Sequence, residues 1–523
     1  MFCAVADDYA VTATSPDGVT WQSMPIYGAY SFTAICANGT TVGTSQFCAV
    51  ASLTDVADTG INGVGTAGSV TTTNITNQGS GYTIIPTVTY AGSPGSSTDG
   101  SAIVGATFSA NISNYPPVTV PGVVFLNGAY YVMDITSQIW GSYNSGAVNG
   151  DALTWIGTNF INANSISGTP IALHRYLNYI IAFKSNSMEV FYDAGNPPPG
   201  SPLSLVPNAT SKVGCANAYS ITNSGDSIFY MSYSQKNGYK ISTLDNMTSV
   251  PISTPSIERI INQTGALTGR VHSYELRVSG HKFYVLTLTG INTTLAYDIE
   301  MKRWAKWSYL TAQSAKSATM TYANGLVTAT VTAHGYLDGT PVTVAGANQA
   351  AYNGTFTIFY VDANTFTYSI SSTPVTPATG TITSIGYDEG YMPFSVYLGD
   401  VDDSYLLHES NGKIYEVNPT LFQDSGIPIS VDIRTKLVDG GNSDRKHISK
   451  AEIIGDKSTS TVYFRYTDDD YQTYCGYRPI DMSSSRSQVK RVGSTRRRAF
   501  ELKHLDNTDF RVEELEIDVD KGE

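Results

Sequence analysis

The sequence predicts an all-β protein: a β-propeller with two small inserted β domains and a C-terminal antiparallel β-sandwich. Among the 523 residues, Gly, Thr, Ser, Asn and Tyr are abundant and only 14% are charged, a composition that favours short strands and turns. A heptad repeat is absent and helical periodicity is almost absent. Short alternating segments recur about every 40 to 50 residues, which is the spacing of four-stranded propeller blades.

A repeat near the N-terminus gives the first indication of blades. The segment Phe-Cys-Ala-Val-Ala at 2–6 recurs at 47–51. Between the copies lies a turn that runs from Asp17 to Trp21, and a related segment ends at Trp155. We expect Asp17 to accept backbone N–H bonds in its turn and the tryptophans to pack between blades.

Hairpins indicate further blades, each as two apolar strands around a polar turn. The turns are at Asn127-Gly128, Lys184-Ser185-Asn186, Asn237-Gly238, Ser279-Gly280, Thr289-Gly290 and Asn411-Gly412. They predict a propeller of about five to seven blades over 1–53, 113–322 and 387–426. A β-sandwich built of hairpins would show the same local pattern and is the alternative.

Three segments differ in composition from the predicted blades. Residues 54–112 are rich in Gly, Ser and Thr and predict a small inserted β domain. Residues 323–386 contain four alternating runs and predict a second insertion, a compact β-sandwich. From 427 to 523 the charge rises and strands follow one another closely, which predicts a separate C-terminal sandwich for ring or platform contacts.

Basic residues are unevenly distributed. All 31 Lys and Arg residues follow residue 174, so the first third is purely acidic. A basic cluster consists of Arg486, Lys490, Arg491, Arg496, Arg497 and Arg498. We expect either a solvated strand face with counter-charges from Glu513, Glu514 and Glu516, or a contact to an acidic face of the next subunit or ring. The asymmetry argues against a general nucleic-acid-binding surface.

The sequence gives no sign of catalytic, cofactor-binding or metal-binding residues. The five cysteines and seven histidines are scattered, without the spacing of a metal site or disulfide framework. No Glu precedes Glu189 and no Arg precedes Arg175, so half of the predicted propeller could not supply the Glu and the clustered Arg of a sialidase-type glycosidase site. Phosphate-loop and nucleophile-elbow motifs are absent. Without an apolar run of about 18 residues or a signal peptide, we expect a protein that is made in the cytoplasm and not inserted into a membrane.

Several stretches resemble the packaged-DNA stabilisation proteins of short-tailed bacteriophages. They are 174–177, 187–196, 212–220, 280–286, 296–298, Trp304 with Trp307, 496–500 and 510–515. The resemblance covers about 120–310 and 390–520, in the family's order. In this context Trp304 and Trp307 are expected to be structural residues of the propeller.

The resemblance implies a virion protein of the tail that is assembled in the host bacterial cytoplasm. It implies a tail-hub or nozzle ring, usually of six copies, below the portal and adaptor rings. Such a ring retains packaged DNA and forms its exit channel without specific DNA recognition, next to tail needle or plug and fibre or spike proteins. The alternative is a receptor-binding tail component whose inserted domains hold carbohydrate.

Overall fold

The structure is a computed structural model that describes residues 118–142 and 155–521, except 198, 400–403 and 425. Nearer the N-terminus it describes the strands β1 (Phe2–Val5), β2 (Val11–Ser15), β3 (Gln22–Pro25), β4 (Ser31–Asn38) and β5 (Gln46–Ser52). Asp17, Trp21 and the predicted insertion at 54–112 lie outside the described residues. The chain divides into two units, Met1–Leu267 and Thr268–Glu523, and each is described by itself.

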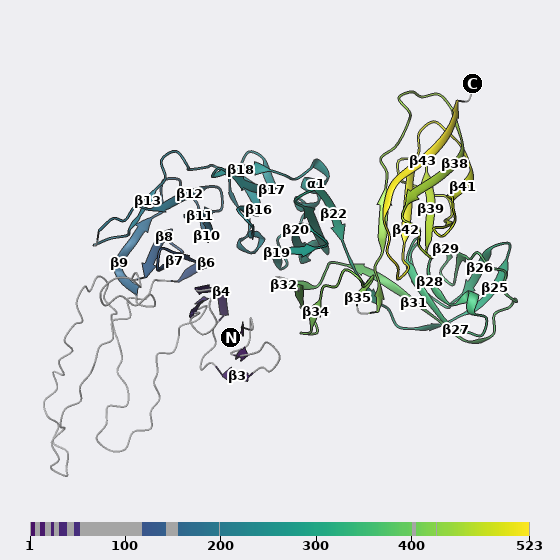
Figure 1. Cartoon of the computed structure of the whole chain (residues 1–523), viewed down its shortest axis with the longest axis horizontal. Helices are drawn as coiled ribbons and strands as arrows, with labels where there is room; N and C mark the ends of the chain where they lie inside the picture. Colours follow the sequence, from purple (N-terminus) through teal and green to yellow (C-terminus); the bar gives the residue numbers. More distant parts are fainter. Residues whose placement is uncertain are drawn as a thin grey trace, which may run out of the picture. The chain divides into compact units, whose positions relative to one another are not determined.

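Unit 1 consists of antiparallel sheets whose strands follow one another along the chain (Figure 1). The first complete sheet contains β6 (Thr119–Leu126), β7 (Ala129–Asp134), β8 (Gln138–Ser142) and β9 (Trp155–Asn162). The second contains β10 (Pro170–Tyr176), β11 (Tyr179–Lys184), β12 (Met188–Asp193) and β13 (Leu203–Leu205). The third contains β14 (Gly214–Cys215), β15 (Thr222–Ser224), β16 (Ser227–Ser234), β17 (Gly238–Asp245) and β18 (Thr248–Pro251), followed by α1 (Pro255–Ile261).

Strand β11 shows why these sheets stack face to face. Successive side chains of a strand point to opposite faces. Ile180 and Ala182 share a core with the β6–β9 sheet, whereas Ile181 and Phe183 share a core with the β14–β18 sheet. All four are fully buried, so the middle sheet depends on a neighbour on each side.

Two-residue turns set the register of the hairpins. Leu126 pairs with Ala129 across Asn127-Gly128, whose φ angles are 48° and 86°. Positive φ at both turn positions is typical of a type I′ turn, whose twist matches that of the strands it joins. Ser279-Gly280 repeats this geometry with φ angles of 51° and 81°. Both predicted hairpins are therefore confirmed.

Unit 2 begins with a fourth sheet of the same kind. It contains β19 (Val271–Val278), β20 (His281–Leu288), β21 (Thr293–Asp298) and β22 (Arg303–Trp307). A three-stranded sheet of β32 (Phe394–Gly399), β33 (Ser404–His408) and β34 (Ile414–Glu416) packs on it. Tyr274 and Val285 from the first sheet share a core with Phe394 and Leu406 from the second.

In the sequence between β22 and β32, the chain forms a module of two facing sheets. One contains β24 (Lys316–Ser317), β27 (Pro341–Ala347), β28 (Gly354–Thr357) and β31 (Gly380–Gly390), and the other contains β25 (Thr319–Ala323), β26 (Leu326–Thr330), β29 (Phe359–Asp362) and β30 (Thr365–Ser369). Their shared core runs from Ala318 to Ile382. Strand β31 also pairs with β23 (Tyr309–Ala312), so the chain enters and leaves the module side by side.

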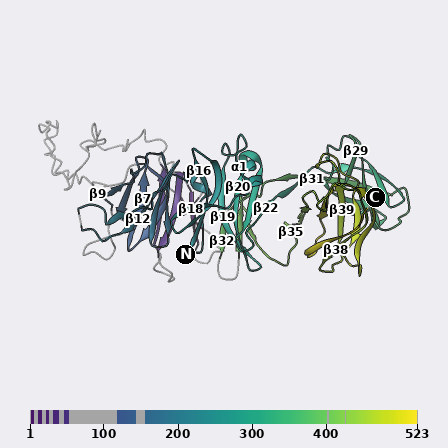
Figure 2. The ribbon, with the colours of Figure 1, turned by 90° about the horizontal axis from the view of Figure 1, so that it is seen from above.

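The C-terminal part is a sandwich of two sheets, with β39 and β38 in different layers (Figure 2). The first layer has the order β37 (Val431–Arg434), β42 (Ala499–His504), β39 (Thr461–Thr467) and β40 (Arg478–Asp481). The second has the order β41 (Ser487–Thr495), β38 (Lys446–Gly455) and β43 (Val512–Lys521). Phe464 and Leu502 from the first layer meet Ala451 and Ile453 from the second in a common core.

A buried ion pair fixes the connection between β9 and β10. Lys184 Nζ lies 2.5 Å from Glu189 Oε1, and neither side chain is more than 1% exposed. Lys184 also donates to the carbonyl oxygens of Ala163 and Ile166. Glu189 accepts from the backbone N–H groups of Ser165 and Ile166. The pair therefore attaches the 163–166 segment to the β11–β12 hairpin.

We predict strong coupling between the two members of this pair. Glu189→Gln leaves a buried lysine charge without its counter-charge and should cost about 3 to 5 kcal/mol. The double variant Lys184→Met/Glu189→Gln removes that charge and should lose at least about 1 kcal/mol less than the sum of the single variants. Urea denaturation of all three variants and the wild type measures this coupling. Additive losses would show that the pair does not act as a unit.

The half-buried carboxyl of Asp424 makes stability depend on pH. Asp424 lies in the short ladder of β35 (Gln423–Asp424) with β36 (Ile427–Pro428). Burial raises the pKa of Asp424 from 3.8 to about 6. Above the unfolded-state value the folded protein therefore holds a proton that the unfolded chain has lost, so this residue reduces stability as pH rises through about 4 to 6.

Replacing Asp424 by Asn removes this ionisation. We predict that Asp424→Asn raises stability at pH 7 by up to about 3 kcal/mol and changes it little at pH 4. The measurement is the difference between the urea denaturation midpoints of variant and wild type from pH 4 to 8. A difference that does not grow with pH would contradict the prediction.

Candidate interface of the C-terminal sandwich

The predicted basic cluster begins at Arg486, directly before β41, and continues along β41 and the loop that follows it. Ile448 pairs with Gly493 and Lys450 pairs with Lys490, so Arg491 and Val492 together oppose one residue of β38. Arg491 has a φ of 57° at this bulge. The extra residue turns Val492 into the core, while Lys490 and Arg491 remain exposed.

Arg498 is buried and bonded within its own sandwich. Its Nε and Nη2 donate to the two carboxylate oxygens of Asp468, each at 2.6 Å. Nη1 donates to the carbonyl of Val492 at 2.6 Å, and the guanidinium lies 3.6 Å from the ring centroid of Tyr466. The side chain is 3% exposed. Arg498, which was predicted to contact another subunit, therefore has a structural role in its own chain.

The three consecutive aspartates of the neighbouring hairpin have different partners. Asp468 binds Arg498, and Asp470 pairs with Arg497 at the surface. Asp469 accepts hydrogen bonds from Thr467 and Thr473, which lower its pKa to about 2. All three aspartates therefore accept hydrogen bonds from side chains of the same chain.

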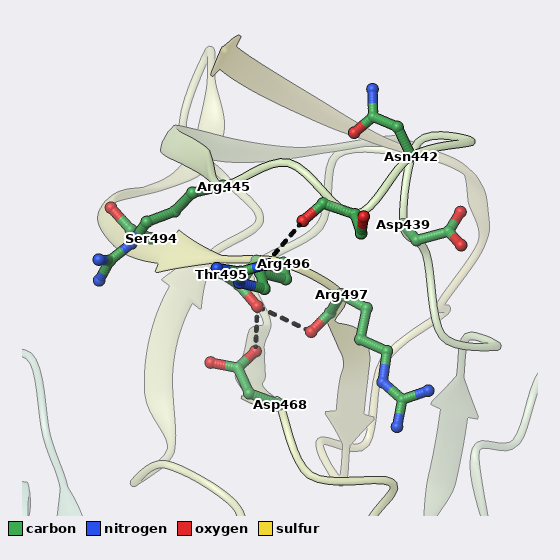
Figure 3. A pocket seen from close by; sticks show the side chains of 9 residues that line it. Asp439, Asn442, Arg445, Asp468, Ser494, Thr495, Arg496 and Arg497 are labelled. Atoms are coloured by element: carbon green, nitrogen blue, oxygen red, sulfur yellow. Dashed lines mark hydrogen bonds between the residues drawn. The ribbon is translucent and has the colours of Figure 1, made fainter. Parts of the chain in front are cut away.

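Beside Arg498 lies an open hollow of about 680 Å³. Its lining is Asp439, Asn442, Ser443, Arg445, Asp468, Ser494, Thr495, Arg496 and Arg497. Figure 3 shows Thr495 hydrogen-bonded to Asp468 and to the Arg497 carbonyl, at 3.0 and 2.7 Å. Arg496 donates to the Ser443 carbonyl at 3.3 Å, and Arg445 is exposed. With Asp468 bound to Arg498, the hollow presents exposed arginine side chains and the exposed carboxylate of Asp439 to solvent.

The acidic residues expected to neutralise the cluster lie elsewhere. Glu513, Glu514 and Glu516 are on β43, and β38 separates β43 from β41. Glu513 pairs with Arg511. Among the described residues, no ion pair joins these glutamates to the basic cluster, and Arg486, Lys490 and Arg491 are exposed.

A second arginine joins the 316–390 module to the sandwich. Arg465 on β39 donates to Glu501 at 2.7 Å and to Asp338 of the module at 2.8 Å. Lys503 donates to the Gly339 carbonyl at 2.8 Å. Burial acts to raise the pKa of Glu501, but the hydrogen bond and charge of Arg465 lower it below its usual value. Sequence reasoning missed this contact because its partners are far apart in the chain.

The predicted structural tryptophans have different surroundings. Trp155 begins β9, is half-buried and pairs in register with Ser142. Trp304 lies 4.9 Å from Tyr297 between ring centroids. Trp307 lies 5.1 Å from Phe283 at the core shared with β32–β34.

Asp17 and Trp21 lie outside the described residues, so their turn stays a prediction, but a turn of the same kind is present at Asp134 and Trp140. Asp134 is fully buried and accepts from the backbone N–H groups of Thr136 and Gln138. Its other oxygen accepts from Trp140 Nε1 at 2.9 Å. The sequence reasoning missed this pair, although an aspartate six residues before a tryptophan was the available signal.

Comparison with known families identifies the chain. The phage stabilisation family model, described as "Bacteriophage P22 Gp10, beta-propeller", matches residues 42–336, more than half of the sequence. The chain belongs to this phage stabilisation family. It is thus a bacteriophage structural protein of the packaged-DNA stabilisation class, and the predicted all-β, propeller fold is confirmed. The match ends at residue 336 of this chain. The resemblance over 390–520 therefore stays a prediction.

The other comparisons add no function. No curated protein matches the chain. The AfRom2 CNH domain is 8% identical, with 49% of this chain and 82% of that chain covered and a TM-score of 0.22. The xyloglucan PUL GH43B of Bacteroides ovatus is 9% identical, with 77% and 82% covered and a TM-score of 0.21. A structure titled "Glycoside hydrolase" is 12% identical, with 76% and 96% covered and a TM-score of 0.17. Similarity this low carries no argument.

Two classes of feature are absent from the described part of this family member. Its helices include none that is long and apolar enough to cross a bilayer. The same residues contain no group of three or more His, Cys, Asp and Glu side chains arranged to hold a metal ion.

The basic cluster allows a prediction that separates structural from surface arginines. Arg498→Ala removes the fork to Asp468 and leaves the Val492 carbonyl unsatisfied, which should cost about 2 to 4 kcal/mol. Arg498→Lys should recover only part of this loss, because an ammonium cannot form the planar fork. The matched control Lys490→Ala should change stability by less than about 0.5 kcal/mol. Urea denaturation compares the three, and equal losses at Arg498 and Lys490 would refute the assignment.

Proposed function

We propose that the protein is a tail-hub or nozzle subunit of a short-tailed bacteriophage. In this proposal six copies form a ring below the portal and adaptor rings, retain the packaged DNA and form its exit channel. The observation that carries the proposal is membership of the phage stabilisation family over residues 42–336. The neighbours in the tail would be the portal or adaptor proteins and a needle, plug, fibre or spike protein.

The action we propose is mechanical and interfacial. Contacts buried between identical copies resist the pressure of the genome until a downstream plug or needle is released. Exposed charge at the C-terminal sandwich supports a role in assembly, because Arg486, Lys490, Arg491 and Arg445 have side chains available to another surface. Arginine forks suit carboxylates on a neighbouring protein.

The charge of the chain supports passage of DNA without tight binding. The formal net charge is −13, and no Lys or Arg occurs before Arg175. An acidic channel wall repels phosphate and lets a duplex slide, whereas a basic wall would hold it. We therefore propose that acidic groups dominate the channel; a strongly positive channel in the assembled ring would contradict this.

We propose no catalysed reaction. Two fully buried carboxylates of unit 1, Asp134 and Glu189, are occupied by structural hydrogen bonds and by Lys184. A glycosidase would need two carboxylates facing a substrate.

A receptor-binding role is the second candidate. It rests on the two predicted inserted domains, 54–112 and 323–386, which would hold host carbohydrate at the particle surface. Copy number and position separate the candidates: six copies on the tail axis support the hub, and trimers at the periphery support the spike.

Removal of the protein from the virus tests the proposed function. We predict that particles made without it package DNA and then lose it, because the exit channel is left open. The measurement is nuclease-protected DNA per particle over time, with wild-type protein supplied in trans as the control. Full heads that keep their DNA would defeat the stabilisation role.

A further inference from the structure

The second layer of the C-terminal sandwich has two edge strands within the described residues. Its order is β41-β38-β43, so β41 and β43 each pair on one side only (Figure 1). Strand β43 runs over ten residues, from Val512 to Lys521. A long edge strand is a template for association unless it is covered or charged.

Strand β43 carries a row of acidic groups. Glu514, Glu516 and Asp518 pair in register with Ile454, Glu452 and Lys450, and Asp520 follows opposite His447. All four acidic side chains are exposed. No ion pair within the described residues includes any of them.

The opposite face of β43 is incompletely covered. Leu515 and Ile517 pack against the sandwich core but are only partly buried. Val519 is 44% exposed. This edge therefore combines free backbone groups, accessible apolar surface and negative charge.

Strand β41 has the opposite charge. Arg486, Lys490 and Arg491 are exposed on or beside it. Arg478 donates to the carbonyls of Lys490 and Arg491, so these carbonyls are already hydrogen-bonded. A partner at this edge would therefore meet basic side chains. The carbonyls of Lys490 and Arg491 would not be available to it.

The two charged edges of one chain cannot neutralise each other. Strand β38 lies between them, which separates β41 from β43 by about 10 Å. Across this sheet Lys490, Lys450 and Asp518 occupy successive strands in register. Lys450 pairs instead with Glu452 at 3.3 Å.

From this arrangement we propose that β43 of one copy binds the β41 edge of the next copy, acid against base. Each copy then uses two different surfaces, a heterologous contact that forms a ring when the rotation closes. The inference rests on the proposed ring and names the surface that builds it. The contacts would be Glu514, Glu516 and Asp518 on one side and Arg486, Lys490 and Arg491 on the other.

Charge reversal tests this pairing on the full chain. The acid-reversed variant is Glu514→Lys/Glu516→Lys/Asp518→Lys, and the base-reversed variant is Arg486→Glu/Lys490→Glu/Arg491→Glu. Each alone places like charges at every contact, so its assembly midpoint should rise at least about tenfold in concentration. An equal mixture should assemble again with alternating copies, since every contact then joins opposite charges. Native mass spectrometry and sedimentation measure the assembly of each variant alone and of the mixture. Incorporation of each variant into the tail is scored in particles.

The outcomes distinguish the interface from the function. Recovery on mixing supports the pairing, and misfolded variants could not produce it. A control with Lys236→Glu and Glu300→Lys, both exposed and remote from this sheet in sequence, should assemble like wild type. If the wild type forms rings and the reversed variants assemble equally well, the proposed interface is wrong. The interface is also wrong if the two variants fail to assemble with each other on mixing. Either result leaves the hub role standing. Wild-type protein absent from the tail axis would defeat the hub role itself.

Discussion

The burial of both faces of the blade strands is the constraint on which the rest of the structure depends. In β11, Ile180 and Ala182 enter one core while Ile181 and Phe183 enter the next. A sheet with two apolar faces is stable only between two covering layers. Successive sheets must therefore stack, and radial repetition of such sheets is the solution that propellers use. Extra chain can enter this stack where its ends meet, as β23 and β31 do around the 316–390 module, without breaking a core.

Buried charges in this chain fix joints between elements. Lys184 and Glu189 hold the β9–β10 connection, while Arg465 joins the module to the sandwich. Arg498 attaches the Asp468 hairpin to the bulged end of β41. Burying a charge is costly unless a partner and hydrogen bonds compensate for it. Such pairs therefore add less to net stability than to the choice of one arrangement.

Local patterns made the all-β class and the hairpins predictable, but not the roles of individual charges. Asn127-Gly128 and Ser279-Gly280 specify their turns through positive φ at two adjacent residues. No comparable local rule predicts which residues of the basic run from Arg486 to Arg498 are buried. A bulge at Arg491 changes the phase of side-chain alternation, so Val492 is buried and counting by two fails beyond it. The partners that decide burial are also distant: Asp468 for Arg498, and Asp338 for Arg465. The Asp134–Trp140 pair does not follow the pattern of Asp17 and Trp21, because six positions separate its two members in place of four.

The separation of charge within one sheet bears on the symmetry of assembly. With a net charge of −13, identical copies repel each other unless unlike surfaces meet. A two-fold contact brings a surface against itself, so an acidic β43 would face an acidic β43. A head-to-tail contact brings β43 against β41, where the exposed charges are opposite. Electrostatics therefore favours a directional contact over a two-fold one, and a directional contact is what the proposed ring needs.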